Sequence, residues 1–143
     1  MTRTKLVLLV LVGFFVILQL VPVNQTNPDV IQDVNAPADA NEILRESCYD
    51  CHSNETVWPW YSRIAPGSFL ITVDVTKGRK HLNLSEFVDL DAFDSTDIAN
   101  EIIEVLDEDE MPLPPYLILH PNASLSESER NTLKDWAKTL YPK

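Results

Sequence analysis

The 143-residue chain has few glycines, few cysteines and few basic side chains. Three glycines, with no G-x-G-x-x-G or G-x-x-x-x-G-K-S/T string, argue against a fold that cradles nucleotide phosphates. Two cysteines are too few for a disulfide scaffold or a four-cysteine metal site. Eleven basic against 22 acidic side chains give a net charge of −11, which argues against nucleic-acid binding because phosphate contacts need clustered Lys and Arg.

One uncharged apolar run, LVLLVLVGFFVILQLVPV, covers residues 6–23. As a helix it would measure about 27 Å, close to the ~30 Å hydrocarbon core of a bilayer. Arg3 and Lys5 mark its cytoplasmic end, and no Ala-x-Ala cleavage site follows. We expect an uncleaved transmembrane anchor over residues 1–23, with a cleaved signal as the alternative. Both place the rest of the chain on the periplasmic side of the cytoplasmic membrane.

The rest of the chain divides into a short linker and one folded domain. Residues 24–36 are polar and lack periodicity, which predicts a tether. Residues 37–143 are then the folded domain, for which we expect an all-α fold. Helices are expected over residues 38–51, 68–80, 94–108 and 127–140.

Two of these expected helices differ in how clearly the pattern defines them. The stretch 68–80 also alternates like a strand, but no second strong strand is present to pair with it. The stretch 94–108 carries apolar side chains at helical spacing, and Ser126 with Glu129 predicts a capping box for the last helix. The stripe of the third helix consists of Ile98, Ile102, Val105 and Leu106.

The strongest motif is C-x-x-C-H, formed by Cys48, Cys51 and His52, the attachment string of a c-type haem. On a helix these positions face the same way, so each thiol can form a thioether with a haem vinyl group. The imidazole then binds the iron as the proximal ligand. The alternatives are a disulfide beside an idle histidine, a redox pair without its usual βαβ context, and a zinc site without a fourth ligand. We expect one covalently attached haem c.

Met111, in the string EMPLPPY, is the expected distal ligand. A His/Met pair raises the reduction potential relative to two histidines. The neighbouring prolines predict a stiff, non-helical loop that presents a weak ligand without depending on the Fe–S bond. The alternatives are a methionine of the core, with His81 or His120 as the ligand instead.

Aromatic and basic side chains after the haem string are further candidates for contact with the cofactor. Trp60 and Tyr61 are expected to form a wall of the haem site, and Arg79 to neutralise a propionate. An ordinary aromatic core and solvated surface charges are the alternatives. Other side chains of the same types nearby are Trp58, Arg63, Lys77 and Lys80.

An acidic stretch precedes the expected distal ligand. From residue 81 to residue 129 there are 13 acids and no Lys or Arg, and four consecutive acids, residues 107–110, adjoin Met111. If this loop lies at the haem edge, its charge steers a basic redox partner. The alternative is that these acids serve only solubility.

Three strings together resemble a known family. CYDCHSNETVWPWYSRIAPGS, GRKHLNLSEF and EMPLPPYLILHPNASLSESERNTLKDWA, within residues 37–141, are similar to the single-haem "haem-binding domain" family of small bacterial c-type cytochromes. The resemblance implies an all-helical, class I cytochrome c-like fold with one haem c, often behind an N-terminal membrane segment. It carries the haem roles onto Cys48, Cys51 and His52, and Met111 falls at the usual methionine position. The acidic stretch before Met111 departs from the family.

The sequence therefore predicts a membrane-anchored monohaem cytochrome that transfers single electrons outside the cytoplasm. It has no convincing set of catalytic acid–base residues, so we expect a carrier rather than an enzyme. The alternatives are a haem-based sensor or small-ligand binder, in which a gas displaces Met111, and a haem enzyme such as a peroxidase or a haem subunit of a larger redox enzyme.

Overall fold

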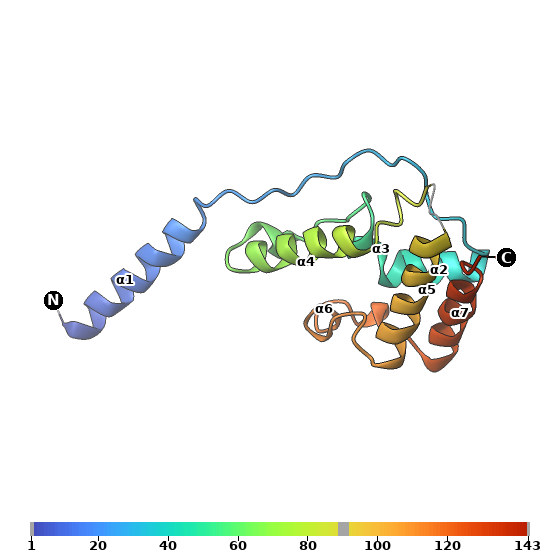
Figure 1. Cartoon of the computed structure of the whole chain (residues 1–143). Helices are drawn as coiled ribbons and strands as arrows, with labels where there is room; N and C mark the ends of the chain where they lie inside the picture. The colour runs from blue at the N-terminus through green and yellow to red at the C-terminus, as the bar shows by residue number, and fades with distance from the viewer. Residues whose placement is uncertain (1, 89–91, 143) are drawn as a thin grey trace.

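The computed structural model describes residues 2–88 and 92–142, and their secondary structure is helical (Figure 1). Across these residues no strand is formed, and Gln32 and Glu86 make an isolated β-bridge. The expected all-α class is therefore confirmed. The elements are α1 (Arg3–Leu18), α2 (Ala38–Ser47), α3 (Tyr49–His52), η1 (Trp60–Arg63), α4 (Gly67–His81), α5 (Ala92–Asp107), α6 (Pro114–Leu117), η2 (Pro121–Ala123) and α7 (Glu127–Lys138).

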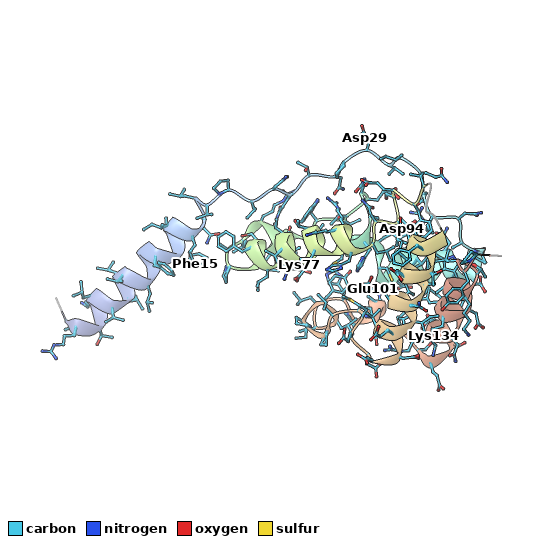
Figure 2. All side chains as sticks on the ribbon, viewed as in Figure 1. Phe15, Asp29, Lys77, Asp94, Glu101 and Lys134 are labelled. Atoms are coloured by element: carbon cyan, nitrogen blue, oxygen red, sulfur yellow. The ribbon has the colours of Figure 1, made fainter. Side chains whose placement is uncertain are left out.

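The apolar N-terminal segment forms α1, which projects away from the other helices in Figure 1 and carries Phe15 in Figure 2. The helix ends at Leu18, before Pro22, and its 16 residues measure about 24 Å. Among residues 2–88 and 92–142, no helix combines the length and the apolar character needed to cross a membrane. The transmembrane helix expected over 6–23 is therefore not found.

The expected tether lies against the folded part of the chain. The Val34 N–H donates to the Leu84 carbonyl at 2.8 Å, and the Ile31 N–H donates to the Ser85 carbonyl at 3.0 Å. The side chain of Val34 is 7% exposed and belongs to the hydrophobic core. In Figure 1 the connection from α1 to α2 passes alongside α4 before it reaches this contact.

The core lies where α2, α5 and α7 meet. Leu44 of α2, Leu106 of α5 and Trp136 of α7 are buried together in one apolar cluster. The predicted capping box holds the start of α7, because the Ser126 hydroxyl accepts from the Glu129 N–H and the Glu129 carboxylate accepts from the Ser126 N–H.

The expected helix over 38–51 is divided into two. Its residues form α2 and α3, and Cys48 between them has φ −120° and ψ −35°, outside the helical range. The other three expected helices are confirmed as α4, α5 and α7, with their ends shifted by one or two residues. The break places the first cysteine of the C-x-x-C-H motif at the junction between two helices.

Candidate cofactor-binding site

A cavity of about 780 Å³ is lined by α3 and α4 and by α5, α7 and the loop around α6. This volume suits a small-molecule or cofactor site. Figure 2 shows Lys77 on α4 and Glu101 on α5, two charged side chains of a lining that is otherwise largely apolar. The apolar lining includes Leu70, Ile71 and Val75 of α4, Ile98, Ile102, Val105 and Leu106 of α5, and Leu133 and Trp136 of α7.

The C-x-x-C-H residues all line this cavity. The N–H groups of Cys51 and His52 donate to the Cys48 carbonyl at 3.1 and 2.8 Å, which closes one helical turn and brings the three side chains to one face. Both cysteines are free thiols in the structure. Burial raises the pKa of each thiol to about 12, whereas redox-active thiols have lowered pKa values. Buried thiols with raised pKa values are not typical of a redox pair.

The imidazole of His52 is oriented by a backbone carbonyl. Its Nδ1 lies 3.1 Å from the Leu82 oxygen, and because a carbonyl only accepts, Nδ1 carries the proton. The lone pair is then on Nε2, the arrangement found in metal-binding histidines. Burial lowers the pKa of His52 and so favours the neutral form, which is the form that binds a metal.

Gly78 allows α4 to approach the haem string closely. A Cβ at this position would lie 2.5 Å from the Cys51 carbonyl oxygen, closer than real Cβ atoms come to any atom. No larger residue fits unless the backbone moves. Sequence reasoning missed this role, although a glycine inside a predicted helix lowers helix stability and so signals a packing requirement.

Met111 lines the same cavity from the loop after α5. The N–H groups of Glu110 and Met111 both donate to the Val105 carbonyl, at 3.0 and 3.3 Å, which ties the loop to the helix end. The loop was expected to be non-helical throughout, but Pro114 begins the short helix α6. Proline is tolerated there because the first turn of a helix needs no N–H donor.

The two alternative distal histidines have different surroundings. His81 lines the cavity, but its side chain is 67% exposed and it immediately precedes Leu82, whose carbonyl holds His52. The Nε2 of His120 lies 2.6 Å from the Tyr61 hydroxyl, and the residue does not line the cavity.

Of the three secondary candidates, the structure brings only Tyr61 to the cavity. Trp60 is 75% exposed and lies outside the lining. Arg79 donates to the Ser53 carbonyl at 2.7 Å on another side of α4. Side chains two residues apart on a helix point about 200° away from each other. Lys77 therefore lines the cavity, whereas Arg79 points to another side of α4.

The acidic stretch before Met111 is partly neutralised by α7. Asp107 pairs with Lys134 and Asp109 with Arg130, each at 2.8 Å. Both cations come from the part of α7 beyond residue 129, so the acidic stretch itself does not display them. Glu110 lines the cavity and is exposed, so some negative charge stays at the rim.

These residues fit a covalently attached haem. Two thiols and an oriented imidazole face one apolar cavity, and Met111 reaches it from a separate loop. Within residues 2–88 and 92–142, no three His, Cys, Asp or Glu side chains are grouped to hold a metal ion.

Comparison with known proteins gives one match. The haem-binding domain family matches residues 7–139, which is most of the chain. No curated protein and no solved structure matches. The matched region includes both cysteines, His52 and Met111. The chain therefore belongs to the haem-binding domain family.

Proposed function

We propose that this protein is a monohaem c-type cytochrome that carries single electrons outside the cytoplasm. The observation that carries this proposal is that Cys48, Cys51, His52 and Met111 all line one apolar cavity. When bound, the haem supplies one-electron chemistry whose potential depends on its axial ligands and on the polarity of its surroundings.

Each of these four residues would have a distinct role in binding the cofactor. Cys48 and Cys51 would attach the cofactor through two thioethers, and His52 would offer Nε2 to the iron. Met111 would supply the second protein ligand, a soft thioether that favours the ferrous state. The apolar stripe of α5 keeps water from the site, and a dry site tunes the potential further.

The class I cytochrome c-like fold is part of this proposal. It is supported by an all-α arrangement in which the haem string directly follows α2, and α2 packs with α7 in the core. The arrangement brings the haem string, near the start of the folded part, onto the same cavity as the C-terminal helix.

We propose a carrier rather than an enzyme or a gas sensor, because His52 and Met111 both line the cavity and would together fill both remaining coordination positions of the iron. The test is to mix the reduced holoprotein with carbon monoxide. An unchanged absorption spectrum is the expected result, since Met111 blocks the iron. Rapid binding of carbon monoxide by the unmodified protein contradicts the carrier and supports the sensor or the haem enzyme.

We also propose that residues 6–23 direct the chain out of the cytoplasm and hold it at the outer face of the cytoplasmic membrane. The support is the uncharged apolar run behind Arg3 and Lys5. The full chain should sediment with membranes and resist a salt wash. A soluble periplasmic protein with a processed N-terminus would instead support the cleaved signal.

The redox partner is proposed to be basic. Glu110 at the cavity rim and its exposed neighbour Glu108 supply negative charge beside the distal ligand. Opposite charges speed association at low ionic strength and are screened by salt. The rate of electron transfer to a basic acceptor protein should therefore fall steeply with added salt. A rate that does not change with salt contradicts the proposal of a basic partner.

A further inference from the structure

Four polar side chains form a connected network at one edge of the cavity, and the proposed electron transfer does not use it. The Tyr61 hydroxyl lies 2.6 Å from His120 Nε2. The His120 ring stacks on Tyr116, with centroids 4.1 Å apart and planes 6° from parallel. The Tyr116 hydroxyl donates to Asp50 Oδ2 at 2.8 Å. The network joins η1, α6 and α3 around one histidine.

This network lies between two openings in the surface. A second pocket of about 220 Å³ is lined by Asp50, Tyr116 and His120, with Glu46 of α2 at its side. Asp50 and Tyr116 also line the cofactor cavity, and so does Tyr61. His120 therefore lines the second pocket and contacts two tyrosines that line the cofactor cavity.

We propose that His120 takes up a proton when the cofactor takes up an electron, so that electron transfer by this protein is coupled to proton transfer. This inference rests on the proposed function. The electron comes from a one-electron donor protein, and the proton comes from water through the second pocket. On oxidation both leave, the electron to the acceptor and the proton to water, so charge and mass balance in each direction.

Electrostatics provides the reason for the coupling. Reduction adds one negative charge to an apolar cavity, where the low effective dielectric lets charges interact more strongly than in water. A proton on a nearby imidazole offsets that charge. Histidine is the side chain whose charge ordinarily changes between pH 5 and 8.

The hydrogen bond between His120 and Tyr61 transmits the protonation state of the imidazole to the cavity. Neutral His120 accepts a hydrogen bond at Nε2 from the Tyr61 hydroxyl. Protonated His120 donates at Nε2 instead, which frees the phenol hydrogen to turn toward the cavity that Tyr61 lines. Protonation therefore reverses the hydrogen bond and adds a donor to the edge of the cavity when negative charge is added.

The groups that face His120 favour this assignment. They are the phenols of Tyr61 and Tyr116 and the carboxylates of Asp50 and Glu46, and no Lys or Arg lines the second pocket. Burial and the hydrogen bond to Asp50 raise the pKa of Tyr116, and burial raises the pKa of Tyr61, so both phenols keep their protons.

The experiment is to measure the midpoint potential of the haem-loaded protein from pH 5 to pH 9. The ratio of reduced to oxidised protein at fixed potential should shift with pH by up to tenfold per pH unit, about 59 mV for one electron. His120→Gln should remove this slope. Tyr61→Phe keeps His120 but removes its hydrogen bond to the phenol, and should reduce the slope. His81→Gln, which removes the other histidine outside the haem string, should keep it.

The outcomes separate this inference from the function on which it rests. A reversible one-electron potential that does not change with pH overturns the proton coupling and leaves the carrier intact. A slope that survives in His120→Gln, or is lost in His81→Gln, also overturns it. A preparation without attached haem overturns the proposed function itself.

Discussion

The two sides of the cavity are built differently. On the His52 side, backbone contacts fix the site: Gly78 lies against the Cys51 carbonyl, and Nδ1 of His52 donates to Leu82. On the Met111 side, apolar side chains and two N–H bonds to the Val105 carbonyl hold the loop. The comparison indicates that the attachment side is rigid and the distal side can adapt. A change of residue is therefore expected to be tolerated better on the Met111 side than on the His52 side.

The largest loss of stability is expected from Gly78→Ala, which adds a side chain on the rigid side. The new Cβ would lie 2.5 Å from a backbone oxygen, so α3 and α4 must separate. We expect a loss of about 3 kcal/mol in the free energy of unfolding, the upper end for overpacking, and little haem-loaded protein. Thermal unfolding measures the loss of stability, and the haem content of the purified protein measures the loss of attachment. Gly13→Ala is the matched control because nothing lies within 4 Å of that position, and equal losses in both variants would contradict the contact.

Met111→Leu tests the adaptable side with little change in volume. Because such swaps usually lower stability by less than ~1.5 kcal/mol, the protein should fold and attach haem. Loss of the sulfur should abolish the far-red sulfur-to-iron absorption band of the oxidised protein and lower the potential. Carbon monoxide should then bind to the reduced form. If the unmodified protein already lacks the band, Met111 is not the distal ligand.

Arg79→Gln tests how the rigid side is braced. The guanidinium donates to the Ser53 carbonyl at 2.7 Å and to the Thr56 hydroxyl at 2.8 Å, just after the haem string, and to the Thr26 carbonyl at 2.9 Å. We expect a loss of about 2 kcal/mol in unfolding free energy with an unchanged haem spectrum, because partly exposed charged bonds contribute modestly. Arg63→Gln at an exposed position should change stability by less than ~0.5 kcal/mol. A change in haem spectrum in Arg79→Gln would instead indicate contact with a propionate.

The smallest effect is expected from Tyr116→Phe, which removes the donor to Asp50 between the two sides. The Asp50 carboxylate still accepts a hydrogen bond from the Val57 N–H at 3.1 Å. The loss in unfolding free energy should therefore be about 1 kcal/mol. Tyr141→Phe removes an exposed hydroxyl bonded to Asn100 at 2.8 Å and should change stability less. Chemical denaturation of both variants compares them, and equal losses would show that the Asp50 contact adds nothing.

Local patterns in the sequence predicted much of the fold and the first part of the site. The stripe of Ile98, Ile102 and Val105 identified α5, and the Ser126–Glu129 pair identified the start of α7. C-x-x-C-H identified the residues at the cavity because covalent attachment requires fixed spacing. These signals depend on neighbours within a few positions, which a single sequence displays.

The missing parts depend on contacts between distant segments. The docking of residues 31–34 on the 84–85 backbone uses main-chain groups that any sequence has. The direction of Arg79 depends on where Ser53 lies, and the His120 network joins residues 50, 61 and 116. The end of α1 at Leu18 precedes Pro22, a signal that the uninterrupted apolar run concealed.

The central claim is tested most directly by the mass and colour of the purified protein. The chain should be expressed in cells that attach c-type haem, and its intact mass and absorption spectrum should be measured after denaturation. We expect one added haem mass that remains bound when the protein is unfolded, with loss of that mass in the Cys48→Ser, Cys51→Ser double variant. A colourless protein, or haem released by unfolding alone, would contradict attachment through these two cysteines.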